Sequence, residues 1–465
     1  MNLWSRRELL KTFATAAAIP QFDLSRLAPR RRVGIVGAGM AGVSLAWLLD
    51  GQRDVVLIEA APAIGGNVRS VEVELDGASF VVDMGAQYFH PGPYPTYTTL
   101  LRRLGFYPPS TIVPRAAHTF PATITVDAVG EATPRFVSPL FFDRLWPLLT
   151  PWNWAGVWAF AVAFPAAQTR EQADESWDLT LEDWLPTLGL AREQWEGMLL
   201  PWAASLYSGD IDEARSLSAR AAMIFAAKAL PPNPLTPVQY YVLNGGLVQP
   251  LERMLAQCST VRVVTGAPVA RVAREPRGGF TLRCQGRPPI VVDDLVFASS
   301  GPGTRSLLGT MTGTEAQRQA IGAIEFRAAR LALHTDPAYA PADPERQSFL
   351  NCRIQDGYCE ASMHLGAVVT DAPPATADRL WKSWVTHRAT PPAEVLHQTE
   401  YQHMLPSVAT LKAQAAVTRL QGVDGVWFAG GYLHPYDAQE TALRSALDVA
   451  AGLRVTGLRW HALAG

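Results

Sequence analysis

The amino-acid sequence predicts an α/β protein with a discontinuous nucleotide-binding domain and a second domain of mixed α+β structure. Three observations carry this prediction: the chain length, a glycine-rich turn between an apolar strand and a helix near residue 37, and a second strand and glycine turn near residue 430. At 465 residues the chain exceeds the roughly 100 to 200 residues that one core usually serves. Hydrophobic residues make up 48% and charged residues 18%, so we expect nearly all of the chain to fold.

Residues 1–28 precede the predicted fold and resemble a twin-arginine export signal. Arg6 and Arg7 lie before the mildly apolar run 12–19, and residues 16–18 offer a candidate cleavage site. We therefore expect the protein to be exported to the periplasm or the cell exterior, and to stay in the cytoplasm if the signal does not function.

The predicted nucleotide site begins with a strand, a glycine turn and a helix. The apolar run 33–36 is typical of a buried parallel strand and leads into the turn Gly37-Ala38-Gly39-Met40-Ala41-Gly42. We expect Gly37 to permit the tight turn, Gly39 to let the backbone approach a pyrophosphate, and Gly42 to bring the helix close to the strand. This pattern predicts a domain of the Rossmann type.

A second apolar strand, residues 55–58, ends in Glu59. A carboxylate at this point is placed to accept hydrogen bonds from the ribose hydroxyls of an adenosine, and its charge repels a 2'-phosphate. The sequence therefore disfavours NADP as the ligand.

Two further segments of small residues bear on the choice between NAD and FAD. Gly65-Gly66 follows the second strand with Arg69 just beyond, and another apolar strand ends in Asp83-Met84-Gly85-Ala86-Gln87. Together with Glu59, these segments resemble those of the superfamily of flavin-containing amine oxidases, protoporphyrinogen oxidases and phytoene desaturases, in which all three line FAD. The resemblance covers most of the chain and implies an FAD-dependent oxidoreductase.

The resemblance extends to a strand and glycine turn near the carboxy terminus. The run 426–431 is followed by a helical pattern over 438–447, and in the superfamily these elements hold the ribityl chain and the ring of the flavin. An acidic residue commonly follows the Phe-Ala-Gly of this motif, whereas this chain has Gly431. We therefore expect one hydrogen bond to the ribityl chain to be lost or to come from water.

These segments, with a strand at Val269 that resembles the one contacting adenine, define the expected FAD site. The residues expected to bind FAD are Gly37, Gly39, Ala41, Gly42, Glu59, Gly65, Gly66, Arg69, Gly85, Ala86, Gln87, Val269, Gly430, Gly431, Glu440 and Thr441. No cysteine follows Cys359, so the carboxy-terminal thioether to flavin seen in some amine oxidases cannot form. We expect FAD to be bound non-covalently.

The order of these segments predicts how the domains divide the chain. We expect residues 31–100, 240–300 and 410–460 to form the FAD-binding domain. Residues 101–239 and 301–409 then form the substrate domain.

Large apolar residues are dense between 136 and 165. Pro147, Pro151 and Asn153 interrupt this run, and a membrane-spanning helix needs about 20 uninterrupted apolar residues, so we do not expect a transmembrane segment. Two interpretations stay open. The run either packs in the core, or forms a helical lid over a hydrophobic substrate channel, with peripheral contact with a membrane.

Flavin oxidases of this kind mainly position the reacting carbon over the ring, and no acid or base is obligatory. Amine oxidases of the superfamily usually carry a lysine near the flavin, yet no lysine occurs between Lys228 and Lys382, which weakens the case for an amine. We name Tyr401 and His403 as the candidate catalytic residues. A structural histidine is the alternative for His403.

Three functions therefore stay open. The first is an FAD-dependent oxidoreductase that removes a hydride from a hydrophobic small molecule, an amine or an unsaturated lipid. The second is an FAD-dependent double-bond isomerase or desaturase acting on fatty acids or isoprenoids. The third is a non-catalytic, flavin-bearing partner of a biosynthetic complex.

Charge and cysteine spacing exclude other classes of function. The formal net charge is −2 and no basic block interleaves with aromatic residues, so we do not expect nucleic acid as a partner. The four cysteines show neither a C-x-x-C pair nor metal-like spacing with histidine, so we expect no metal site. In an exported protein Cys352 and Cys359 are candidates for a short-loop disulfide, and buried free thiols are the alternative.

Overall fold

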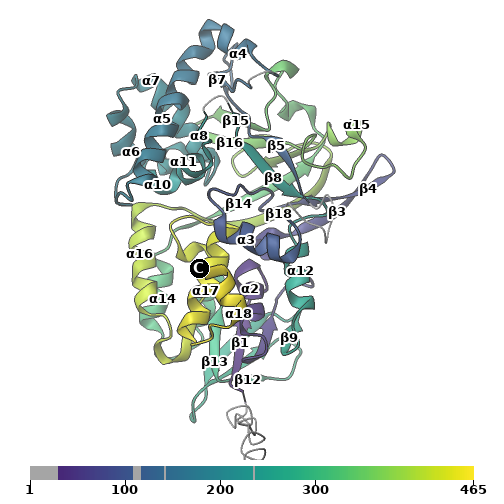
Figure 1. The fold of residues 1–465 in the computed structure, drawn as a ribbon, viewed down its shortest axis with the longest axis vertical. Coiled ribbons are helices and arrows are strands. Elements are labelled where there is room, and N and C mark those ends of the chain that lie inside the picture. Colours follow the sequence, from purple (N-terminus) through teal and green to yellow (C-terminus); the bar gives the residue numbers. More distant parts are fainter. Residues whose placement is uncertain (1–29, 108–116, 141–142, 234–235, 465) are drawn as a thin grey trace, which may run out of the picture.

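The computed structural model describes residues 30–107, 117–140, 143–233 and 236–464. These residues form two regions that lie one above the other in Figure 1. We call the lower one, around a five-stranded sheet, the nucleotide domain, and the upper one, around a seven-stranded sheet, the substrate domain. The predicted export signal, residues 1–28, lies outside the described residues.

The sheet of the nucleotide domain is parallel throughout, as expected for a Rossmann-type α/β domain. Its strand order is β19-β13-β1-β2-β9. Their bounds are β1 Arg32–Val36, β2 Asp54–Ile58, β9 Val261–Val264, β13 Asp294–Phe297 and β19 Val426–Phe428. The central strands are runs of Val, Ile and Leu because both faces of the sheet are covered.

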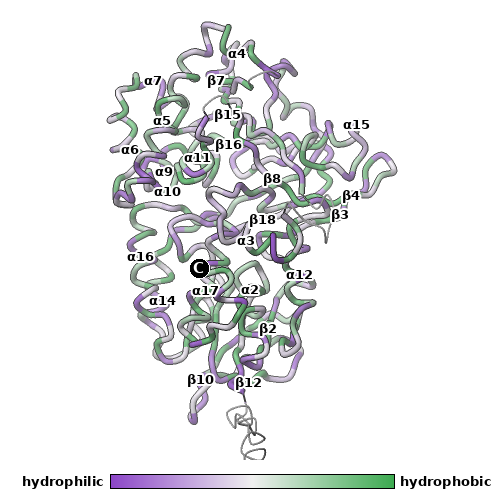
Figure 2. Tube along the Cα trace, in the orientation of Figure 1, coloured by the Kyte–Doolittle hydropathy of each residue, from purple (hydrophilic) through white to green (hydrophobic). Residues whose placement is uncertain are grey.

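One face of this sheet is covered by helices from distant parts of the chain. These are α2 (Met40–Leu49), α3 (Pro95–Leu104), α12 (Gln249–Ala256) and α17 (Gln439–Gly452). All ten residues of α2 are buried, so its hydrophobic character on every side reflects a central position. Figure 2 shows this hydrophobic stretch inside the lower domain.

The other face packs against a small antiparallel sheet and further helices. These elements are β10 (Val269–Arg274), β11 (Phe280–Cys284), β12 (Ile290–Val292), α13 (Gly301–Leu308), α14 (Glu315–Gly322) and α16 (Val408–Arg419). Leu308, Met311 and Ile321 belong to the same apolar cluster as Phe297 and Phe428 of the parallel sheet. Residues 301–324, predicted to belong to the substrate domain, therefore pack as part of the nucleotide domain.

The sheet of the substrate domain has the order β18-β14-β17-β16-β15-β6-β7. All neighbouring strands are antiparallel except β15 and β6, which are parallel. Their bounds are β6 Ile124–Ala128, β7 Phe136–Val137, β14 Phe326–His334, β15 Leu350–Gln355, β16 Tyr358–His364, β17 Trp381–Trp384 and β18 Val395–Met404. Strands β14 and β18 lie between the two domains in Figure 1.

The aromatic run of residues 136–165 contains both buried and exposed side chains. It forms β7, the short helix α4 (Trp146–Leu149) and most of α5 (Trp154–Gln172). Phe136 and Phe160 are buried and stack with ring centroids 4.3 Å apart, whereas Leu145, Leu149, Trp154 and Trp158 are exposed. Among the described residues, no helix is long and apolar enough to cross a membrane.

Cys352 and Cys359 lie on the neighbouring strands β15 and β16, where both are buried. Neither thiol is in a disulfide, so the free-thiol alternative holds in this structure. Within the described part of the chain, no cluster of His, Cys, Asp and Glu could hold a metal ion.

Candidate functional site

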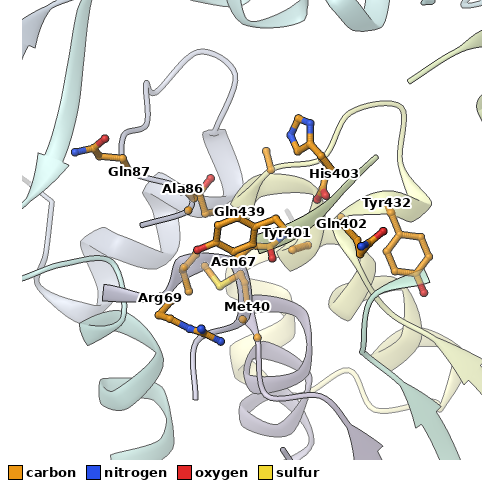
Figure 3. Close-up of a pocket in the computed structure, with 18 of the residues that line it drawn as sticks. Met40, Asn67, Arg69, Ala86, Gln87, Tyr401, Gln402, His403, Tyr432 and Gln439 are labelled. Atoms are coloured by element: carbon orange, nitrogen blue, oxygen red, sulfur yellow. The ribbon is translucent and has the colours of Figure 1, made fainter. Parts of the chain in front are cut away.

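A cavity of about 860 Å³ is lined by residues of both domains. Its nucleotide end lies along the carboxyl ends of the parallel strands, where ligands bind in open α/β sheets. Its other end extends under the seven-stranded sheet and the helices of the substrate domain. In Figure 3, Tyr401 lies at the centre of this cavity, with Arg69 and Met40 on one side and His403 on the other.

The glycine turn after β1 has the geometry of an anion site. Gly37 has φ 110°, and a Cβ there would lie 2.5 Å from the carbonyl oxygen of Ala298 on the neighbouring strand connection. A Cβ on Gly42 would overlap the carbonyl oxygen of Gly37. Helix α2 then begins at Met40 with no acidic residue in its first turn, so its N-terminal N–H groups can face a phosphate.

Two backbone N–H groups hold the carboxylate of Glu59 at the end of β2. The N–H of Ala38 donates to Oε2 (2.7 Å) and the N–H of Ala61 donates to Oε1 (2.8 Å). Each oxygen keeps a further lone pair, because a carboxylate can accept about four hydrogen bonds. Glu59 lines the cavity and is therefore able to accept ribose hydroxyls there.

Two loops are joined at the wall of the cavity. The N–H of Met84 donates to the carbonyl of Arg69 (2.9 Å), and the N–H of Ala86 donates to the carbonyl of Asn67 (2.8 Å). Among the described residues, no carboxylate pairs with the guanidinium of Arg69, which lines the cavity. Arg69 is thus available for an anionic group of a ligand.

Several buried polar atoms of cavity-lining side chains have no hydrogen-bond partner among the described residues. They are Gln87 Oε1, Trp202 Nε1, Tyr401 Oη, Tyr432 Oη and Gln439 Nε2. Buried polar groups are nearly always satisfied in folded proteins, so this set indicates a ligand with several donors and acceptors. FAD fits this requirement, since its ring, ribityl chain and pyrophosphate all carry such groups.

Most of the residues predicted to bind FAD line this cavity. They are Gly37, Gly39, Ala41, Glu59, Gly66, Arg69, Gly85, Ala86, Gln87, Val269, Gly430 and Gly431. Four predicted residues do not line it, namely Gly42, Gly65, Glu440 and Thr441.

Each of these four residues has a structural role beside the cavity. Gly42 allows α2 to approach Gly37, and the N–H of Gly65 donates to the carbonyl of Ala38 (3.0 Å). The buried carboxylate of Glu440 accepts the N–H of Tyr97 in the first turn of α3 (2.8 Å), and Thr441 bonds Ala438 at the start of α17. Their predicted contact with FAD stays a prediction.

Both candidate catalytic residues lie on β18 and line the cavity. Burial raises the pKa of Tyr401, which therefore stays protonated at neutral pH. Burial also lowers the pKa of His403, although its hydrogen bond to the carbonyl of Tyr207 opposes this. Because His403 Nδ1 lies 3.1 Å from that carbonyl, Nδ1 carries the proton and the neutral Nε2 is an acceptor.

The substrate end of the cavity is aromatic. Its rings belong to Tyr88, Phe164, Trp202, Tyr240, Phe349 and Trp384. Tyr88 lies 4.9 Å from Tyr240 and 5.4 Å from Phe349 between ring centroids, and Phe164 lies 5.2 Å from Trp202. Phe164 comes from α5, so the apolar run of residues 136–165 contributes to the cavity wall.

Formal charge is scarce at this end. Among the described residues of the substrate domain that line the cavity, Glu400 is the only Asp, Glu, Lys or Arg, and its side chain is exposed beside Arg330 of the paired strand β14. No lysine lines the cavity within the described part of the chain, in keeping with the gap between Lys228 and Lys382.

Sequence reasoning missed the role of Lys382. It lies on β17, fully buried, and its Nζ donates to the carbonyls of Asp83 (2.8 Å) and Gly85 (3.3 Å) from behind the cavity wall. The carboxylate of Asp83 accepts the hydroxyl of Ser70 (2.5 Å) and the N–H of Leu247 (2.9 Å). The signal available in the sequence was a lone lysine in a short segment bounded by Trp381 and Trp384.

Asp437 was also missed. It lines the cavity next to Gly431, and burial raises the pKa of its carboxyl to about 6. In the sequence, Asp437 lies just before the helix that starts at Gln439, where an acidic residue commonly caps the helix. In the structure Asp437 does not cap this helix.

Comparisons with known proteins agree with this geometry. A model of flavin containing amine oxidoreductases matches residues 40–336. An L-amino-acid oxidase of Pseudechis australis is 46% identical over 60 residues, which are 13% of this chain and 12% of that protein, so the chain matches only a short part of this relative.

Solved structures share the fold over nearly the whole chain. A CLA-producing fatty acid isomerase from P. acnes superposes with a TM-score of 0.63 at 13% identity, covering 91% of this chain and 98% of the other. Putrescine oxidase bound to putrescine superposes with a TM-score of 0.61 at 17% identity, covering 91% and 99%.

Proposed function

The chain belongs to the family of flavin containing amine oxidoreductases and is an FAD-dependent oxidoreductase, and from that premise we propose that its substrate is an uncharged, hydrophobic small molecule. FAD supplies the hydride acceptor in such enzymes, while the protein mainly positions the reacting carbon. The class of substrate therefore depends on the residues that line the substrate end of the cavity.

One observation carries this proposal: the substrate end of the cavity is aromatic and has no buried formal charge among its described residues. Burial of an ion without a partner costs several kcal/mol or more. A diamine, an amino acid or a free fatty acid would each leave at least one charge unpaired there. An uncharged lipid or a monoamine bound in its neutral form would not.

The residues at the junction of the two ends have separable tasks. The rings of Trp202, Tyr240 and Phe349 exclude water and hold an apolar body by contact. Tyr401 presents an unsatisfied hydroxyl and His403 a neutral acceptor nitrogen, so an N–H or O–H of the substrate can be oriented without a charged group. His403 Nε2 is also a neutral acceptor to which such a proton can move.

Cofactor attachment is proposed to be non-covalent. All four cysteines lie within the described residues and none of them lines the cavity. A thioether between cysteine and FAD therefore has no donor at this site.

The proposal is tested by matched substrate pairs. The purified FAD-loaded protein is mixed anaerobically with a long-chain unsaturated fatty acid or its methyl ester, with a hydrophobic monoamine or a diamine of equal length, and with hydrophobic amino acids. We expect loss of the flavin absorbance with the ester or the monoamine. Bleaching by the diamine, the amino acids or the free fatty acid, but not by their partners, would overturn the assignment.

A double-bond isomerase is the second candidate, favoured by one observation. No lysine lines the cavity among the described residues, whereas amine oxidases of the superfamily usually carry a lysine near the flavin. In this reaction the hydride returns to another carbon of the same molecule, so a shifted double bond forms without oxygen and without net bleaching. Stoichiometric peroxide formation from the same substrate excludes it.

A non-catalytic flavin-bearing partner of a biosynthetic complex is the third candidate. This third function replaces the first two under two conditions. No compound of the panel bleaches the flavin or is rearranged, and the ring face of the bound flavin is closed to small molecules such as sulfite.

Export and membrane contact are proposed separately from catalysis. Fusion of residues 1–28 to a folded reporter should carry it across the inner membrane only while Arg6 and Arg7 are present.

Residues 145–169 contain no charged residue and expose Leu149 and Trp158, so we propose contact with a lipid surface there. Co-sedimentation with phosphatidylcholine vesicles should weaken when both are replaced by Ser.

A further inference from the structure

Position 431 lacks the acidic side chain that the resemblance leads one to expect, and another residue occupies its space. Gly431 directly follows Phe428-Ala429-Gly430. A Cβ built on Gly431 would overlap Oδ1 of Asp437 and lie 3.2 Å from its Cγ. The carboxylate of Asp437 thus stands where a side chain at 431 would begin, and it lines the cavity.

The loop that carries Asp437 is held in place from several sides. The backbone turns back over Gly431 through the 3-10 turn η9 (Gly431–Leu433) before α17 begins at Gln439. Gln414 Nε2 donates to the carbonyls of Tyr432 (2.9 Å) and His434 (2.5 Å). The position of the carboxylate is therefore built by the fold and does not depend on a flexible side chain alone.

Within the described residues, the carboxylate of Asp437 has no hydrogen bond and no ion pair. Burial alone accounts for the rise of its pKa to about 6. A carboxylate in a cavity without a donor is costly unless a ligand supplies one. The missing partner must be a hydrogen-bond donor such as a hydroxyl group.

The strand order indicates which hydroxyl this is. Glu59 follows β2, the glycine turn follows β1, Ser299 follows β13, and Gly431 follows β19. Parallel neighbours are about 4.8 Å apart, so a dinucleotide laid along this edge meets the sites in that order. With the adenosine ribose at Glu59 and the pyrophosphate at the glycine turn, the next group toward β19 is the ribityl chain.

We propose that Asp437 provides the carboxylate that accepts a ribityl hydroxyl of FAD, in place of an acidic residue at position 431. This inference rests on FAD binding in the cavity and adds a cofactor-binding residue to it. It also replaces the expectation that this hydrogen bond is lost or made by water.

The test exchanges the two positions and measures FAD affinity. Cofactor-free protein is titrated with FAD, and the dissociation constant is obtained from quenching of flavin fluorescence. Loss of a hydrogen bond to a charged acceptor should weaken binding about 10- to 100-fold in Asp437→Ala. Gly431→Asp alone should also bind weakly, because its side chain meets Asp437. The double variant Gly431→Asp/Asp437→Ala should recover most of the affinity.

Gly431 is suitable for this exchange because its φ does not lie in the left-handed region, so a side chain is allowed. Asp448→Asn is the matched control, since its carboxylate lies on the same helix α17 but is 69% exposed and pairs with His434. We expect no change in affinity there. Should Asp437→Ala fail to fold, Asp437→Asn keeps the size and should still bind FAD more weakly.

The outcomes separate this inference from the proposed function. Parent-like FAD binding by Asp437→Ala and Asp437→Asn, or a folded double variant that recovers nothing, overturns the role of Asp437 and leaves the cofactor assignment intact. A parent protein that binds no FAD at all overturns both.

Discussion

Two glycines of the same turn should respond in opposite ways to replacement by alanine. In Gly42→Ala the new Cβ would overlap the carbonyl oxygen of Gly37 and lie 3.0 Å from its carbonyl carbon. Both atoms are backbone, so no rotamer change relieves the overlap. In Gly39→Ala the Cβ would lie 3.7 Å from Gly66 Cα, which is an ordinary contact.

The magnitudes follow from this geometry. Overpacking costs about 1–3 kcal/mol, and alanine in a helix is favoured by about 1 kcal/mol over glycine. Gly42→Ala should therefore lower the free energy of unfolding by up to about 2 kcal/mol. Gly39 has φ −81°, which suits alanine, and its replacement should stay within about 0.5 kcal/mol. Its methyl group nevertheless enters the gap toward Gly66 through which a pyrophosphate would approach, so FAD affinity should fall at least about tenfold.

The assay measures the two quantities separately. Urea unfolding of the cofactor-free protein gives the stability, and titration with FAD gives the dissociation constant. If Gly39→Ala destabilises the cofactor-free protein as much as Gly42→Ala does, or binds FAD like the parent, the assignment of distinct roles is wrong.

Three further predictions concern charge at the cavity. Lys382→Met removes a buried cation behind Gly85 and should lower the midpoint potential of bound FAD. Asp83→Asn removes the nearby anion and should raise that potential. Equal shifts of the same sign in both variants would indicate only general disruption of the site. The pKa of Asp437 is raised from 3.8 to about 6. Its protonated form therefore stabilises the cofactor-free protein fully below about pH 4, and this stabilisation is lost as pH rises through about 6. Asp437→Asn should abolish this dependence of the free energy of unfolding on pH. His403→Gln should keep the shape of the parent pH profile for flavin bleaching near neutral pH, because the pKa of His403 is already lowered; a lost ionisation in that range would contradict a neutral histidine.

The nucleotide end was predictable because its signals are local. A buried strand, a glycine turn and a helix occupy adjacent residues, and Glu59 follows the next strand directly. Backbone conformation and strand ends follow from neighbours in the chain, so these residue types suffice to place them. Glu440 and Thr441, which do not line the cavity, bond to backbone groups, because polar side chains at the start of a helix can serve as caps as readily as ligand contacts.

The substrate end was only partly predictable. Residues 136–165 were recognised as apolar, but apolar character does not say which side chains face a core, a cavity or solvent. Phe160 is buried, Phe164 lines the cavity and Trp158 is exposed, although all three lie on α5. Helix rotation against its neighbours decides these positions, and contacts with α11 (Ile224–Ala229) and β7 set that rotation.

By itself, the sequence determined the Rossmann-type start, the flavin family and the lack of a lysine where amine oxidases usually carry one, since each depends on residue types at short spacing. Only the tertiary structure decided that Lys382 holds Asp83 and Gly85, about 300 residues earlier, and that Asp437 fills the space beside Gly431. The register of central strand β17 and the reversal of the chain before α17 create these contacts. Both arise from packing over long chain separations, which no local pattern of residues specifies.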